Sequence, residues 1–315
     1  MQTTSNSSAF IDAQVYSNFI LELIHDGLLP TTFYRDVSDF GSGTTLNIKT
    51  VGTVTLQDLV EDQAIAYNPI DTGTVNLTIT DFIGNGWYVT DVLRQDGSQI
   101  DVLMAQHATE NTRAIQENFE TKFLEVCNTA QTDAAANNIN GFAHRIASAE
   151  TNNIVTLDHL KEMKLAFDKA GVPAAGRVLL VDPVVEATLN GLLTQTATVN
   201  NDPMFQGLVQ DGFARDHQFV RNIMGWNIMT SNRLDKGSFG DGTTTVSDGV
   251  ANVFMNVLDD QHKPVMAAWR QQPMVEGERN KDKKRDEFVS SARFGIGAQR
   301  LDTLGILITS ASAFE

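Results

Sequence analysis

Cysteine is almost absent from this sequence, because Cys127 is the only one among 315 residues. A single cysteine excludes an internal disulfide and a cysteine-based zinc site. The six histidines offer no alternative, since none has a second histidine or a cysteine at metal-ligand spacing. We therefore predict no metal site, and we interpret Cys127 as a small buried apolar residue of a helix.

Enzymatic motifs are missing as well. Neither Gly-x-Ser-x-Gly nor the phosphate-binding Gly-Lys-Ser/Thr sequence occurs. Residues 295–300 imitate the start of a dinucleotide-binding loop, but the third glycine is missing and only fifteen residues follow. Asp182 follows an apolar strand, where α/β enzymes place catalytic acids, yet helix capping also explains it. The sequence thus predicts no catalytic residue, no cofactor and no enzymatic activity.

Long apolar runs are also lacking. No stretch of eighteen apolar residues occurs, so we expect no transmembrane helix and no membrane partner. The first nine residues are polar and uncharged, which is unlike the basic start of a secretory signal.

Basic residues are scarce and unevenly placed. The chain has 23 Lys and Arg against 39 Asp and Glu, a net charge of −16, which argues against wrapping nucleic acid through phosphate contacts. Residues 1–157 carry 19 acids and 6 bases, whereas residues 158–315 carry 20 acids and 17 bases. Two interpretations stay open: solvated faces of a soluble protein, or an acidic part of one copy that meets a basic part of another.

The first third of the chain predicts an arm followed by an extended hairpin. Residues 10–29 have helical spacing, which favours a short helix in an N-terminal arm. Polar and apolar residues alternate strictly over 44–51 and again over 74–80, as in half-buried strands. Between them, residues 52–73 contain four acids and no base. Two strands cannot hold a core of their own, so the hairpin needs another surface to lie on.

A very long helix is expected next. No Gly or Pro interrupts residues 98–140, and Ser98 with Asp101 forms a capping-box pattern at the start. If residues 98–130 are helical, the element is roughly 50 Å long. Its apolar side chains recur at helical spacing and predict one packing stripe: Ile100, Leu103, Met104, Ala108, Ile115, Phe119, Phe123, Val126 and Ala130.

The remainder alternates helices and strands before it becomes mostly strand. Thr156 caps a predicted helix over 157–170, a buried strand follows at 177–181, and Asp182-Pro183 starts another helix. Short strands are expected within 219–229 and a flexible glycine-rich loop over 237–249. Further strands are predicted at 252–258, 264–269, 288–296 and 304–309, with a charged turn over 276–287.

This order of parts resembles the major capsid proteins of tailed double-stranded-DNA bacteriophages, the HK-97 fold. Four local stretches are similar to that family: 33–37 with 43–48, 68–71 with 75–79, 177–183, and 293–297. The resemblance implies an α+β fold with five parts. They are an N-terminal arm (1–43), an E-loop hairpin (44–82), a peripheral domain with the spine helix (83–153), an α/β axial domain (154–250) and the strands of the peripheral sheet (251–315).

The resemblance also implies a function. It predicts a structural subunit that assembles with itself into hexamers and pentamers of an icosahedral head around double-stranded DNA. Scaffolding, portal and decoration proteins are its implied partners. Its location would be the virion shell, assembled in the host bacterial cytoplasm. Candidate inter-subunit residues are the charged positions of the hairpin and of the late turn: Lys49, Asp58, Glu61, Asp62, Arg279, Lys281, Lys283, Lys284 and Arg285. The alternatives are an encapsulin-type compartment, which shares the fold, and a monomeric acidic binding protein.

Overall fold

The structure of the protein is a computed structural model. It describes residues 28–29, 31–39, 43–52, 72–97, 100–131, 138–199 and 222–314, with scattered positions between 56 and 70. The helix expected over 10–29 therefore lies almost wholly outside the described residues, as do Ser98 and Gln99. Among the described residues, no helix is long and apolar enough to span a membrane.

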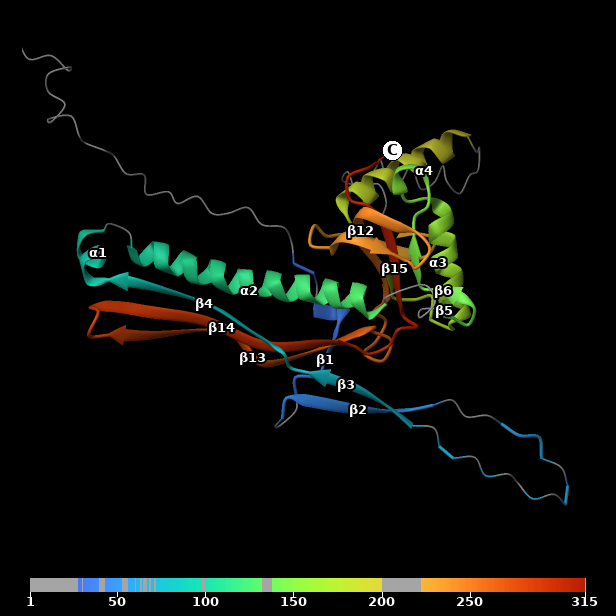
Figure 1. Ribbon diagram of the computed structural model, residues 1–315, viewed down its shortest axis with the longest axis horizontal. Helices are drawn as coiled ribbons and strands as arrows, with labels where there is room; N and C mark the ends of the chain where they lie inside the picture. Colours follow the sequence, from blue (N-terminus) through green and yellow to red (C-terminus); the bar gives the residue numbers. More distant parts are fainter. Residues whose placement is uncertain are drawn as a thin grey trace, which may run out of the picture.

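Two mixed sheets and one long helix dominate the architecture (Figure 1). The four-stranded sheet has the order β1-β13-β14-β4, and the helix α2 lies along one of its faces. The helical elements of this part are α1 (Asp91–Asp96) and α2 (Ile100–Ala130). The strands are β1 (Arg35–Asp36), β4 (Asp81–Thr90), β13 (Val265–Asn280) and β14 (Arg285–Ala298).

The second sheet has the order β7-β15-β12-β8-β10-β9, and β11 pairs with β12. Its strands are β7 (Arg145–Ala147), β8 (Arg177–Val181), β9 (Asn222–Ile223), β10 (Trp226–Thr230), β11 (Lys236–Gly240), β12 (Thr245–Asn256) and β15 (Leu304–Ser310). Helices α3 (Leu157–Lys169) and α4 (Pro183–Val199) belong to this part, and a small hairpin, β5 (Asn138–Ile139) with β6 (Phe142–Ala143), precedes it. Short 3-10 turns stand at Thr31–Phe33 and Thr151–Asn153.

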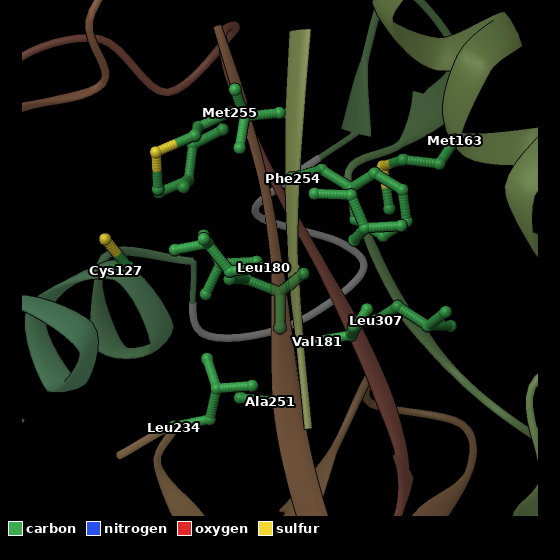
Figure 2. Packing of buried hydrophobic residues seen from close by; sticks show 14 of the residues in the cluster. Cys127, Met163, Leu180, Val181, Leu234, Ala251, Phe254, Met255 and Leu307 are labelled. Atoms are coloured by element: carbon green, nitrogen blue, oxygen red, sulfur yellow. The ribbon is translucent and has the colours of Figure 1, made fainter. Parts of the chain in front are cut away.

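The main core surrounds the second sheet. Figure 2 shows Phe254 and Met255 of β12 on opposite sides of the strand, as the period of two requires. Met163 of α3 packs on the side of Phe254, whereas Cys127 of α2 lies on the other side. Cys127 is completely buried, and this burial raises the pKa of its thiol, which agrees with its interpretation as an apolar core residue.

Local capping places α3 and α4 as the sequence predicted. The backbone N–H of Thr156 donates to Nδ1 of His159, within a reciprocal capping box at the start of α3. At the start of α4, a carboxylate oxygen of Asp182 accepts from the N–H of Val184, 3.2 Å away. The second carboxylate oxygen of Asp182 lies 2.8 Å from Nζ of Lys236. Asp182 is therefore a structural residue in this chain.

An aromatic cluster holds α2 on the four-stranded sheet. The ring of Phe119 lies 4.6 Å from that of Trp269 on β13 and 5.1 Å from that of Phe294 on β14. Tyr34 adds an edge contact at 5.3 Å. The predicted stripe fails at Leu103, which is 49% exposed because it lies near the free start of the helix.

Three other sequence predictions need correction. The strands after residue 251 do not form one sheet, because β12 and β15 pair with each other and β12 pairs with β8. The segment 237–249 is no flexible loop, since β11 and the start of β12 form an antiparallel pair there. The charged turn is also shorter than 276–287, because only four residues, 281–284, separate β13 from β14. The flanking charged residues belong to the strands, since a strand with one solvent-exposed face tolerates charged side chains.

The predicted hairpin consists of β2 (Thr45–Val51) and β3 (Thr72–Thr78) and is anchored on its own chain. Leu77 is 1% exposed and packs against Met266 and Ala268 of β13. At the same place β3 crosses β14 so closely that a Cβ on Gly295 would lie 2.5 Å from the carbonyl oxygen of Thr78. Beyond this anchor the hairpin extends away from the body (Figure 1).

Truncation of a buried and of an exposed side chain on α2 should affect the stability of the subunit very differently. Phe119→Ala removes a ring that is 8% exposed, and we expect the free energy of unfolding of the subunit to fall by about 3–5 kcal/mol. Leu103→Ala on the same helix should change it by less than about 0.5 kcal/mol. Denaturant titration measures both, and equal losses would contradict this packing.

The stability of the protein should also depend on pH through a buried histidine. His144 is fully buried, and this desolvation lowers the pKa of its imidazole below the ordinary value of 6.5. As the pH falls below 6.5 the unfolded chain binds the proton first, so the stability that neutral His144 contributes is present above 6.5 and declines below it. The melting temperature should therefore fall between about pH 7.5 and about pH 5.5, and less steeply in His144→Gln. A slope that is as steep in His144→Gln as in the wild type would contradict this assignment.

Candidate functional site

The described residues contain no group of three or more His, Cys, Asp and Glu side chains that would hold a metal ion. Two projections from the body are the prominent features instead. One is the distal part of the β2–β3 hairpin, and the other is the end of the β13–β14 pair beside α1 (Figure 1). We call the first the hairpin tip (residues 52–71) and the second the lysine turn (residues 281–284).

The hairpin tip exposes apolar side chains that a monomer would normally cover. Leu56 is 90% exposed and Tyr67 is 94% exposed, and Leu59 and Ile70 are also more than two thirds exposed. The predicted contact residues Lys49, Asp58, Glu61 and Asp62 are all exposed here. Large exposed apolar groups next to charges are typical of a contact surface.

The arginines near the lysine turn have partners within the same chain. Both terminal nitrogens of Arg279 donate to the carboxylate of Asp91 at 2.7 Å, and one of them also lies 2.9 Å from Asp286. Arg94 reaches the other oxygen of Asp286 at 2.5 Å. Hydrogen bonding by Arg279 holds the pKa of the Asp91 carboxyl below its usual range. This cluster joins α1 to the end of the four-stranded sheet.

Arg285 is engaged in the same way on the opposite face of the sheet. Its Nε lies 2.6 Å from a carboxylate oxygen of Glu287, and its guanidinium stands over the ring of Tyr88, 4.2 Å from the centroid. Hydrogen bonding by Arg285 lowers the pKa of Glu287. Arg279 and Arg285 therefore have ion-pair partners within the chain, and their predicted role in inter-subunit contacts stays a prediction.

The three lysines of the turn are different. Lys281, Lys283 and Lys284 are not fully buried, and within the described part of the chain no carboxylate lies within 4.0 Å of their ammonium groups. The turn that carries them is ordered by Asn280, whose side-chain oxygen accepts from the N–H groups of Asp282 and Lys283 at 3.2 and 3.1 Å. The structure therefore separates the five predicted basic residues into two arginines with ion-pair partners in the same chain and three exposed lysines.

Sequence reasoning missed the apolar part of this end. Val92 and Leu93 of α1 are 67% and 54% exposed, and α1 is connected to the lysine turn because the N–H of Asp91 donates to the carbonyl oxygen of Lys284. No periodic pattern in the six-residue helix α1 signals this position. Both projections thus combine exposed apolar side chains with charge, acidic at the hairpin tip and basic at the lysine turn.

Comparison with known protein families finds one match. Residues 71–309 match the sequence model of a family described as phage capsid protein. No curated protein sequence matches the chain.

Similar solved structures cover nearly the whole chain. The capsid structure of the cyanophage P-SCSP1u is 16% identical, with a TM-score of 0.70 over 96% of this chain and 94% of that chain. The mature capsid of bacteriophage PhiM1 is 14% identical, with a TM-score of 0.72 over 99% and 95%. The capsid of a native GTA particle is 12% identical, with a TM-score of 0.62 over 97% and 99%. The fold is that of these shell proteins, as the sequence resemblance predicted.

Proposed function

The chain belongs to the phage capsid protein family, and from this premise we propose that its copies form the hexamers and pentamers of an icosahedral head that encloses double-stranded DNA. The chain is a structural shell subunit of the virion, as this family membership establishes. The arrangement into capsomers, the enclosed DNA and assembly in the host bacterial cytoplasm are the proposed parts. So are contacts with scaffolding, portal and decoration proteins.

The observation that carries the proposal is the exposed hairpin tip. Its base packs on Met266 and Ala268, whereas Leu56 and Tyr67 lie at least 90% exposed further out. A second copy of the chain supplies the cover that these side chains lack. The net charge of −16 supports a container whose wall does not adhere to its DNA.

An encapsulin-type compartment is the alternative with the same kind of shell. The family match favours the phage head, since the matched sequence model describes phage capsid proteins. Particles purified from infected or lysogenic cells and treated with nuclease should contain double-stranded DNA. Particles that hold only protein cargo would favour the compartment.

The contact residues that we propose are the acids of the hairpin tip (Asp58, Glu61, Asp62) and the three lysines of the turn, with Lys49 at the base of the tip. Each exposed ion pair contributes only about 0–1 kcal/mol. A shell repeats each pair many times, so together these pairs can decide whether neighbouring subunits associate. Like charge also disfavours one arrangement, because lysine turns of several copies that met one another would repel.

Removal of the hairpin tip tests the assembly role. We expect a chain in which Asn-Gly replaces residues 52–71 to stay folded, because Val51 and Thr72 already pair in register and a two-residue turn can join them. It should keep the wild-type melting temperature but form no shells in electron microscopy. Shells of normal size and yield would show that the tip is no assembly element.

Charge reversal tests the proposed pairing. Replacing Lys281, Lys283 and Lys284 by Glu, or Asp58, Glu61 and Asp62 by Lys, should each lower the yield of shells at low salt. Combining both triple substitutions should restore it, because the opposite charges meet again. Reversal of three exposed lysines of α3, Lys161, Lys164 and Lys169, changes the net charge equally and should leave the yield unchanged. A combined variant that remains as poor as its parents would refute the pairing.

A further inference from the structure

Glu120 is a buried carboxylate at the junction of three segments. It lies in the second half of α2 and is only 5% exposed. On one side is the N-terminal segment at Leu29, and on the other is the loop 231–234 that leaves β10 of the seven-stranded sheet. A carboxylate this deep must have its oxygens hydrogen-bonded, because an unpaired buried charge is strongly destabilising.

The two oxygens of Glu120 serve different segments. Oε2 accepts from the backbone N–H of Leu29 at 3.0 Å. Oε1 accepts from the hydroxyl of Ser231 at 3.3 Å and lies 3.4 Å from a terminal nitrogen of Arg233. The other terminal nitrogen of Arg233 lies 3.1 Å from Oε1 of Glu117, which precedes Glu120 on α2.

Each segment is fixed to a different sheet beyond this junction. The N–H of Ser231 donates to the carbonyl oxygen of Val181 at the end of β8, in the seven-stranded sheet. The N-terminal segment continues into β1, which pairs with β13 of the four-stranded sheet. Glu120 on α2 thus links the N-terminal segment, which continues into the four-stranded sheet, to the loop that is bonded to the seven-stranded sheet.

The N-terminal segment packs against the main core through Leu29, but it also borders a cavity. A cavity of about 660 Å³ opens between the segment, α2 and β13, and it is lined by Leu28, Leu29, Thr31, Glu120, Trp269 and Pro273, among others. Leu28 and Leu29 are each only partly buried. Because the segment borders open space, its hydrogen bond to Glu120 is a main restraint on its direction.

We propose that Glu120 is a positioning residue that fixes the N-terminal segment at residues 28–29 relative to the seven-stranded sheet. The chemistry requires a carboxylate. Its two acceptor oxygens point in different directions and satisfy donors from both sides. A glutamine has only one acceptor oxygen, so it can accept from the N–H of Leu29 or from Arg233, but not from both. This restraint acts within the single chain and is independent of the proposed assembly.

Amide hydrogen exchange of the unassembled full chain tests the proposal. In Glu120→Ala, exchange should rise about tenfold or more at both 28–34 and 231–234, while amides at the centres of β12 and β15 keep their protection. In Glu120→Gln it should rise at one of the two segments only. Glu117→Gln is the matched control, because it removes a partner of Arg233 without touching Leu29, so it should leave 28–34 unchanged.

Unchanged exchange at 28–34 in Glu120→Ala would overturn the proposal. So would an equal rise at 28–34 in Glu117→Gln, since the restraint would then not depend on Glu120. If Glu120→Ala does not fold, Glu120→Gln decides: wild-type exchange at both segments would overturn the proposal, and a rise at one segment alone would support it.

Discussion

One helix that serves two sheets is the constraint on which the rest of the structure depends. The middle of α2 packs through Phe119 on the four-stranded sheet, and its last turns place Leu124 and Cys127 in the core of the seven-stranded sheet. A helix of 31 residues is roughly 46 Å long, so it acts as a rod between the two cores. Its polar C-terminal groups are satisfied too, since buried Arg145 donates to the carbonyl oxygens of Asn128 and Gln131.

Both projections depend on this rod. The hairpin is held where β3 crosses β14, close to the residues that carry α2, and the lysine turn lies where β13 and β14 reach past the start of the helix (Figure 1). The two proposed contact surfaces lie at opposite ends of this braced body, which holds their separation constant. Under that proposal, a subunit transmits the position of one neighbour to the next, as a closed shell of identical copies requires.

Local patterns predicted most of the elements. Strict alternation identified β2 and β3, an uninterrupted stretch without Gly or Pro identified α2, and Thr156 marked the start of α3. The order of these parts along the chain, rather than any single motif, carried the family resemblance. Sheet membership after residue 251 could not be predicted, because β12 pairs with β8, about seventy residues earlier in the chain, and β15 pairs with β12, and no local signal encodes that choice.

The candidate contact residues were chosen because they are charged. A charge in the sequence does not show which residue it pairs with in the fold. Arg279 and Lys281 look alike in the sequence, yet Asp91, 188 positions earlier, engages only Arg279. The exposed Val92 and Leu93 went unnoticed because a six-residue helix is too short to display a period. An ion pair such as that between Arg279 and Asp91 forms only when the fold brings distant segments of the chain together.

The ordered backbone of the lysine turn has a consequence for any partner that binds there. Asn280 and the Arg279 fork already fix the four residues between the strands, so a bound partner need not order them. Ordering a flexible loop of that length on association would oppose binding by about 1–2 kcal/mol for each residue. A contact made of only a few weak ion pairs can therefore remain net favourable, and it can also be released without unfolding the turn.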